Sequence, residues 1–126
     1  MANSIGVDIL ETDRMRRAVE RFGDRFVQRI LGDKEIEVFN RRTDRFIFLA
    51  GRFACKEAVI KALGKYLKDR PSFSQIQIIN DATGQPSLSL PDSLKPLLIG
   101  LEILVSISHD RKYAVAMAVI TEKNNR

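Results

Sequence analysis

Two carboxylates, Asp8 and Glu57, occupy positions where the surrounding pattern predicts uncharged side chains. Asp8 falls within residues 4–10, whose alternation of side chains predicts a β-strand, and aspartate is disfavoured in the middle of a strand. Glu57 falls in a helical stretch, where a rotation of about 100° per residue places it about 20° from Phe46, inside an apolar stripe. Burying an ionised carboxylate is costly unless a cation or hydrogen bonds compensate it. Both positions are therefore candidates for a functional role.

The residues around these carboxylates are compatible with more than one kind of chemistry. Two acidic side chains on separate elements, with lysines and arginines nearby, are typical of a magnesium and polyphosphate site, because Mg²⁺ takes only one or two protein carboxylates besides phosphate oxygens and water. Gly6 lies on the same strand face as Asp8 and would leave room there for a bulky group. The alternatives are an ordinary ion pair between Glu57 and Lys61, four residues later, and a solvated strand end at Asp8.

The elements that position these residues form one predicted domain, residues 1–126. Helices are expected over residues 12–22, 24–31, 33–40 and 43–64, and strands over residues 4–10, 75–80, 87–90, 101–108 and 113–121. Turn signals at residues 81–84 and 109–112 join the last four strands into two hairpins. This order predicts an α+β fold, in which an antiparallel sheet packs on one long helix.

The first and the last of the predicted helices differ in their apolar surface. Thr12 is expected to cap the first helix and Gly23 to end it. The buried side of this helix is predicted to consist of Met15, Ala18, Val19 and Phe22. The long helix is apolar almost all round, so we expect it to contact the sheet on one side and something else, such as another subunit, on the other.

The composition excludes several classes of protein. The single cysteine, Cys55, cannot form an internal disulfide or a zinc site, and a packing role is expected for it in place of a nucleophilic one. The N-terminus lacks the pattern of a secretion signal, and the longest apolar run, residues 97–105, contains Glu102 and is too short to span a membrane. A cytoplasmic protein is therefore expected. The net charge of +5 favours an anionic partner: nucleic acid, an acidic protein, a phosphorylated ligand or a membrane surface.

Four arginines follow helical spacing along the first predicted helix and just beyond it: Arg14, Arg17, Arg21 and Arg25. Such a run is commonly no more than a solvated face. It would also fit a basic nucleic-acid-binding module, although the aromatic residues are mostly phenylalanines at core spacing and offer no stacking platform. A non-enzymatic oligomeric scaffold would explain the apolar long helix, but not Asp8 and Glu57.

Four motifs occur along the chain in a specific order. They are I-G-V-D-I (5–9), F-L-A-G-R-F-A-C-K-E-A (48–58) continuing to K-A-L-G (61–64), D-x-x-G-x-P (81–86) and V-S-I-S-H-D (105–110). Together they extend over nearly the whole chain, which resembles the holo-[acyl-carrier-protein] synthase family, the small bacterial type of 4'-phosphopantetheinyl transferase. Two departures from the usual family pattern are Ser4, where glycine is common, and Lys65-Tyr66 in place of a G-T-G-like turn. Neither departure removes a metal ligand, so activity is expected, while the affinity for coenzyme A is left open.

The resemblance implies a magnesium-dependent transferase of fatty acid biosynthesis and lipid metabolism. Such an enzyme moves the 4'-phosphopantetheine arm of coenzyme A to a serine of apo acyl carrier protein and releases adenosine 3',5'-bisphosphate. The family typically forms homotrimers with active sites between the subunits. A homotrimer in the cytoplasm is therefore expected here, without a nucleic-acid or membrane partner.

The resemblance also assigns roles to single residues of the site. Asp8 and Glu57 would hold the metal ion, and it is left open whether either of them removes the proton of the attacking serine. Lys61, one turn beyond Glu57, would contact the phosphates and stabilise their charge during catalysis. His109 would contribute to the coenzyme A site through a contact with phosphate or nucleotide, and to catalysis.

Five further basic residues are expected at the two substrates. Arg52 and Lys56 project away from Glu57 on the helix, and they could bind the 3'-phosphate of coenzyme A, within the chain or across a subunit interface. A solvated basic edge is the alternative for both. Because the protein substrate of the family is strongly acidic, Arg14, Arg21 and Arg25 are expected to dock it.

Overall fold

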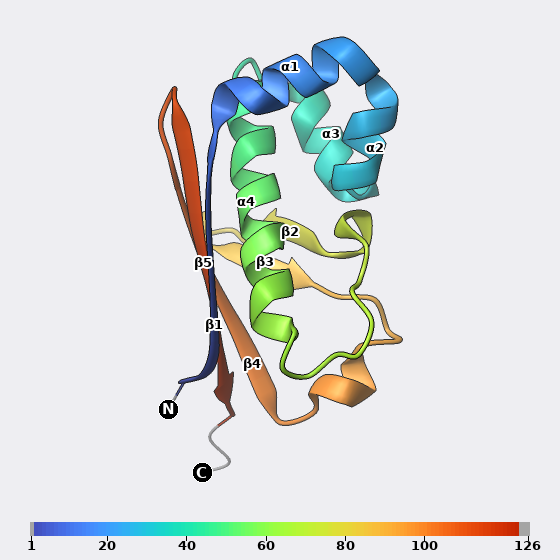
Figure 1. Cartoon of the computed structure of the whole chain (residues 1–126), viewed down its shortest axis with the longest axis vertical. Helices are drawn as coiled ribbons and strands as arrows, with labels where there is room; N and C mark the ends of the chain where they lie inside the picture. Colours follow the sequence, from blue (N-terminus) through green and yellow to red (C-terminus); the bar gives the residue numbers. More distant parts are fainter. Residues whose placement is uncertain (1, 124–126) are drawn as a thin grey trace.

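An antiparallel sheet and one long helix form the two main layers of the fold. The computed structural model describes residues 2–123, so that residues 1 and 124–126 of the predicted domain lie outside the described part. The sheet has the strand order β1 (Ala2–Glu11), β5 (Tyr113–Glu122), β4 (Leu101–His109), and helix α4 (Arg45–Leu63) lies on one of its faces (Figure 1). The predicted α+β architecture is confirmed.

Three short helices and a β-hairpin complete the structure. They are α1 (Thr12–Phe22), α2 (Asp24–Ile30) and α3 (Asp33–Arg41), and the antiparallel strands β2 (Gln77–Asn80) and β3 (Pro86–Ser89). The connections contain two short 3₁₀ helices, η1 (Phe73–Gln75) and η2 (Lys95–Leu98). Helices α1 to α3 gather around the N-terminal end of α4 (Figure 1). Within residues 2–123, no helix combines the length and the apolar character needed to cross a membrane.

Small residues allow α4 to lie close to β1. A Cβ atom on Gly6 would lie 1.9 Å from the carbonyl oxygen of Ala58, a distance at which only glycine fits. Ser4, on the same face of β1, donates a hydrogen bond to the carbonyl oxygen of Ala62 (2.7 Å). Gly6 therefore makes room for α4, which is the bulky group that approaches β1 on the face of Asp8.

The two faces of the sheet differ in burial. The face toward α4 is closed, with Leu10, Ala114 and Ala118 all buried. On the opposite face, the apolar side chains that remain exposed are Ile5, Val7, Ile9, Leu104, Tyr113, Val115 and Met117. The side of α4 that faces away from the sheet contacts α1 and α3 of the same chain at its N-terminal part (Figure 1). The most exposed large apolar side chains of these two layers thus lie on the sheet and not on α4, while the expected contact of α4 with another subunit stays a prediction.

Helix α1 has the predicted length but differs from the prediction at two residues. Glu11, not Thr12, is at the N-cap position, and the buried Oγ1 of Thr12 has no hydrogen-bond partner among the described residues. Met15 is buried as predicted, whereas Phe22 is 57% exposed. Gly23 ends the helix with a φ of 67°, in the left-handed region that favours glycine. Phe22 therefore belongs to the surface and not to the core.

Cys55 has the packing role that was expected for it. Its side chain is fully buried on α4, and burial raises the pKa of the thiol to about 12. A thiol with such a pKa stays protonated at neutral pH and does not act as a nucleophile.

Candidate active site

Strand β1 and helix α4 bring Asp8 and Lys61 together. Asp8 lies on the same face of β1 as Gly6, so its side chain is on the side of α4. Lys61 Nζ lies 3.2 Å from Asp8 Oδ1 and donates a hydrogen bond to the carbonyl oxygen of Val7 (2.9 Å). The Asp8 side chain is 18% exposed. Asp8 is therefore a partly open carboxylate within the strand, and not a residue of a solvated strand end.

Glu57 lies one turn before Lys61 on the same side of α4. Arg70, from the loop that follows α4, contacts it with Nη2 at 2.8 Å from Glu57 Oε1. Lys61 pairs with Asp8 and not with Glu57, which excludes the ordinary i,i+4 pair as the reason for this glutamate. Because Lys61 contacts Asp8 and is the helical neighbour of Glu57, both carboxylates lie on the same flank of α4.

The donor set of this flank fits a magnesium ion. Asp8 and Glu57 each hold one basic side chain, and both remain partly exposed, so neither carboxylate is saturated by the protein. Among residues 2–123, no group of three or more histidine, cysteine or acidic side chains could hold a metal ion. Two carboxylates are, however, the number that Mg²⁺ commonly takes from a protein when phosphate oxygens and water supply its other ligands.

His109 lies at the end of β4, away from this flank. It is exposed, and its Cδ2 atom is 3.5 Å from the position of a Cβ atom on Gly51 of α4. In the sheet, β5 separates β4 from β1, so that Asp8 and Ile107 pair with opposite sides of Ala116. Two strand spacings amount to about 10 Å, and α4 packs against all three strands of the sheet. One chain therefore keeps His109 apart from Asp8.

Lys56 is fully buried, which its position in the sequence does not indicate. Its Nζ donates hydrogen bonds to Glu35 Oε1 (2.5 Å) and to the carbonyl oxygens of Ile30 and Phe73. A lysine ammonium group has three N–H donors, so these partners satisfy all of them. Lys56 thus ties α2, α3 and η1 to α4. The structure therefore contradicts both expectations for Lys56, the contact with a phosphate and the solvated basic edge. Its role is structural.

Arg52 belongs to the same buried network. It is 8% exposed, its Nε lies 3.9 Å from Glu35 Oε2, and its guanidinium carbon lies 4.5 Å from the centroid of the Phe48 ring. Burial lowers the pKa of both Arg52 and Lys56, and the charge of Glu35 opposes this shift. The alternative of a solvated basic edge is therefore wrong for Arg52, while its contact with a phosphate stays a prediction.

Two charged residues of these networks, Glu35 and Arg70, are not among the site residues predicted from the sequence. Glu35 is 1% exposed and accepts hydrogen bonds from the backbone N–H groups of Gly32 and Ile78 (3.0 Å each). The available signal was a glutamate at the third position of α3, where such a side chain commonly bonds back to the start of its helix. Arg70 lies in an irregular loop, where no periodic pattern marks it.

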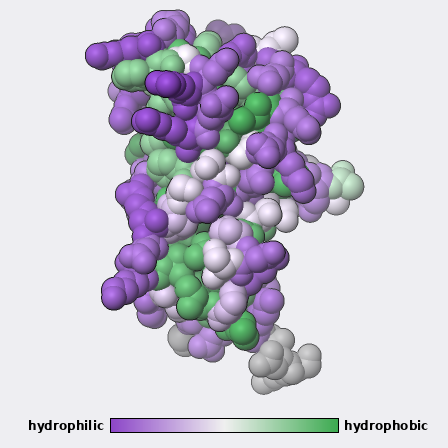
Figure 2. All heavy atoms as spheres, turned by 90° about the vertical axis from the view of Figure 1, so that its right-hand side faces the viewer, coloured by the Kyte–Doolittle hydropathy of each residue, from purple (hydrophilic) through white to green (hydrophobic). Residues whose placement is uncertain are grey.

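A basic surface that also carries the exposed ring of Phe22 lies on α1 and α2. Arg14, Arg21 and Arg25 are all exposed. A hollow between these two helices is lined by Arg21, Phe22, Arg25, Phe26 and Arg29. Figure 2 shows hydrophilic side chains gathered over the end of the molecule that α1 to α3 form. The three predicted docking arginines are therefore accessible. Arg29 lines the same hollow as Arg21 and Arg25.

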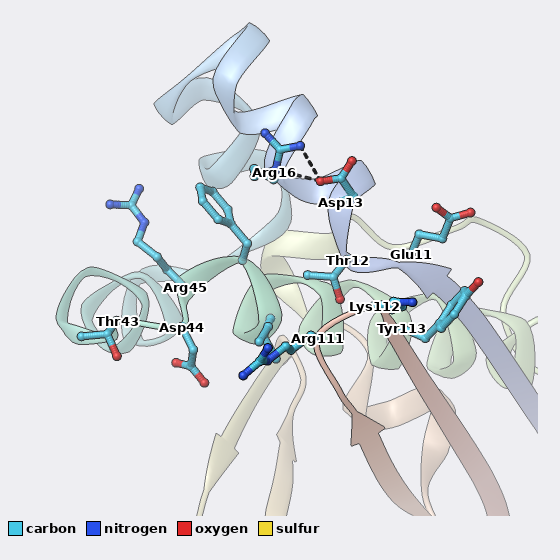
Figure 3. A pocket seen from close by; sticks show the side chains of 12 residues that line it. Glu11, Thr12, Asp13, Arg16, Thr43, Asp44, Arg45, Arg111, Lys112 and Tyr113 are labelled. Atoms are coloured by element: carbon cyan, nitrogen blue, oxygen red, sulfur yellow. Dashed lines mark hydrogen bonds and ion pairs between the residues drawn. The ribbon is translucent and has the colours of Figure 1, made fainter.

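A second hollow lies where α1 and α4 begin (Figure 3). Its basic side chains come from α1, from α4 and from the β4–β5 hairpin: Arg16, Arg45, Arg111 and Lys112. Its acidic side chains are Glu11, Asp13 and Asp44. The residues around this hollow do not include Asp8, Glu57 or Lys61.

Known proteins share the sequence pattern of this chain. Residues 4–118 match the family model of the 4'-phosphopantetheinyl transferase superfamily. The holo-[acyl-carrier-protein] synthase of Protochlamydia amoebophila (strain UWE25) is 41% identical over 120 residues, which are 94% of this chain and 98% of that protein.

Solved structures share its fold. The crystal structure of holo-[acyl-carrier-protein] synthase from Neisseria meningitidis matches with a TM-score of 0.87 and 33% identity, and the match covers 97% of this chain and 100% of that one. The holo-(acyl-carrier-protein) synthase from Bacillus anthracis, in complex with CoA (3',5'-ADP), matches with a TM-score of 0.80 and 34% identity over 98% of this chain and 99% of that one. The chain therefore belongs to the holo-[acyl-carrier-protein] synthase family of the 4'-phosphopantetheinyl transferase superfamily.

Proposed function

We propose that the chain carries out the reaction of its family on the flank of α4 that holds Asp8, Glu57 and Lys61. It transfers the 4'-phosphopantetheine group from coenzyme A to a serine of apo acyl carrier protein, giving the holo carrier protein and adenosine 3',5'-bisphosphate. The observation that carries this proposal is the meeting of β1 and α4, where Lys61 contacts Asp8 (3.2 Å) one turn from Glu57.

Asp8 and Glu57 are the proposed ligands of Mg²⁺. A bound Mg²⁺ would neutralise charge on the diphosphate of coenzyme A and fix its geometry. Lys61 pairs with Asp8 and lies one turn beyond Glu57, and we propose that its ammonium group stabilises the charge that builds on the phosphate oxygens when the serine hydroxyl attacks the β-phosphorus. The oxygen that joins the β- and α-phosphorus atoms leaves with adenosine 3',5'-bisphosphate. The chain contributes mainly positioning and charge stabilisation to this reaction.

A homotrimer would complete the site. His109 lies across the sheet from Asp8, and we assign it to the phosphate or nucleotide part of coenzyme A, bound by the same chain or by a neighbouring copy. The exposed apolar face of the sheet supports association, because Ile5 and Ile9 alone are 60% and 64% exposed.

The carrier protein is proposed to dock on α1 and α2. Arg14, Arg21 and Arg25 are exposed there, and arginines bind carboxylates through paired hydrogen bonds. An acidic partner would also be attracted by the net charge of +5, which speeds encounter. The proposed setting remains fatty acid biosynthesis in the cytoplasm.

The mass of the carrier protein tests this function. After incubation with apo carrier protein, coenzyme A and Mg²⁺, the carrier protein is expected to gain the mass of phosphopantetheine. Asp8→Asn and Glu57→Gln are expected to lower kcat/KM by about a hundredfold or more, because each removes a charge that the reaction needs. Glu37→Gln, which removes an exposed carboxylate from α3, is the matched control and keeps its activity. No gain in mass, or full activity of Glu57→Gln, would refute the proposal.

A further inference from the structure

We propose that Arg70 competes with the divalent cation for Glu57, and thereby sets the affinity of the site for this cation in the absence of coenzyme A. The inference rests on the function proposed above for Glu57. It concerns a residue that lies outside the four sequence motifs of the family, in the loop between α4 and η1.

Arg70 is held over Glu57 at two points. Its Nη2 donates a hydrogen bond to Glu57 Oε1 (2.8 Å), and its guanidinium carbon lies 5.4 Å from the centroid of the Phe73 ring. That ring is itself fixed, because it packs against Phe53 at a centroid distance of 5.2 Å and because the carbonyl oxygen of Phe73 accepts a hydrogen bond from buried Lys56. The ion pair and the cation–π contact together orient the guanidinium group. The fold therefore places Arg70 on this carboxylate.

The charges of the flank make the competition direct. Arg70 neutralises Glu57 as Lys61 neutralises Asp8, so a cation that binds both carboxylates meets a positive charge at each. The Arg70 side chain is 60% exposed, and it can leave Glu57 without opening the core. It also lines a hollow at the end of α4 with residues 67–71 of its own loop, which offers the guanidinium group a place outside the pair.

Binding of Mn²⁺ to the full chain without coenzyme A tests the inference, with electron paramagnetic resonance reporting free Mn²⁺. Arg70→Gln is expected to bind Mn²⁺ about two- to fivefold more tightly than the wild type, a range set by the modest strength of an exposed ion pair. Lys68→Gln is the matched control, since it removes the same charge from an exposed side chain of the same hollow. This control is expected to bind Mn²⁺ as the wild type does.

Equal Mn²⁺ affinity of Arg70→Gln and the wild type would overturn the inference. An equal gain in Lys68→Gln would overturn it as well, because the gain would then come from net charge alone. Glu57→Gln separates this failure from a failure of the proposed function. If Glu57→Gln weakens Mn²⁺ binding while Arg70→Gln does not strengthen it, the metal site stands and the role of Arg70 falls. If Glu57→Gln leaves Mn²⁺ binding unchanged, both fall.

Discussion

Lys56 and Glu57 are neighbours on α4, but their charges have opposite surroundings. Lys56 is fully buried and donates all of its N–H groups to partners within the chain. The Glu57 side chain is 21% exposed and is held by one residue, Arg70. Successive helical residues point about 100° apart, so that one of these side chains faces α2 and α3 while the other faces the open flank beside β1.

This contrast separates a charge that holds the fold together from a charge that is free to bind. A buried ion pair without spare hydrogen-bonding capacity cannot accept a ligand unless the packing around it opens. A partly exposed carboxylate with one counter-ion can exchange that counter-ion at little cost. In this chain, exposure and the number of partners distinguish the two uses of charge better than the residue type does.

The strongest test of the contrast removes the buried cation. Lys56→Met leaves the Glu35 carboxylate buried without its main partner, and we expect the free energy of unfolding to fall by about 3–5 kcal/mol. Glu57→Gln is expected to change it by less than about 0.5 kcal/mol while activity is lost. Urea unfolding followed by circular dichroism measures both, with Lys34→Met, an exposed lysine of α3, as the control. A Lys56→Met variant as stable as the wild type would show that the buried charge of Lys56 does not hold the fold together.

A smaller effect is expected where β1 meets α4. Gly6→Ala would bring a Cβ atom to 1.9 Å from the Ala58 carbonyl oxygen, so strand and helix must move apart at a cost of about 1–3 kcal/mol. Because Asp8 lies two residues further along β1, its contact with Lys61 should loosen and activity should fall together with stability. Gly64→Ala is the control, since its Cβ atom would make ordinary contacts at 3.4 Å and beyond. Full activity of Gly6→Ala would show that the carboxylate site does not depend on this close approach.

The secondary structure of the chain could be predicted from local signals. The helix over residues 12–22 has the same bounds as α1, and the strand over residues 113–121 differs from β5 by one residue. Alternation in a strand and helical periodicity depend on neighbouring residues only, which explains this success. Asp8 and Glu57 could be singled out for the same reason, because each breaks its local pattern.

The surroundings of side chains could not be predicted in this way. The burial of Lys56 depends on Glu35, Ile30 and Phe73, which come from three other elements and become its partners only in the folded chain. Alternation in β1 defines two faces, but it does not say which face α4 covers, so the exposed apolar face of the sheet was not foreseen. Both features arise from long-range packing.

The exposed arginines of α1 are a third kind of charge, which is proposed to bind a protein partner. Arg14→Glu is expected to raise the KM for acyl carrier protein about tenfold, because it replaces attraction to an acidic surface with repulsion, and to leave the KM for coenzyme A nearly unchanged. Lys123→Glu makes the same change of charge just after β5 and serves as the control. Equal increases in both KM values would contradict a separate docking surface.

The smallest effect is expected from an ion pair at the surface. Arg42 donates hydrogen bonds to both carboxylate oxygens of Asp44 (2.6 and 2.8 Å), and this contact lowers the pKa of Asp44 below its ordinary value of 3.8. A lowered pKa in the folded state means that the stabilisation is present above pH 3.8 and is lost as the pH falls through the lower value. Since both side chains are more than one-third exposed, solvent screening limits the effect to a few tenths of a kcal/mol. As the pH falls from 7 to below the lowered pKa of Asp44, the wild type should lose this much more stability than Asp44→Asn, and the difference should vanish in about 1 M salt. The Lys56–Glu35 pair is buried, so its contribution should persist at the same salt concentration. Equal salt sensitivity of the two pairs would show that buried and exposed charges of this chain do not differ in this way.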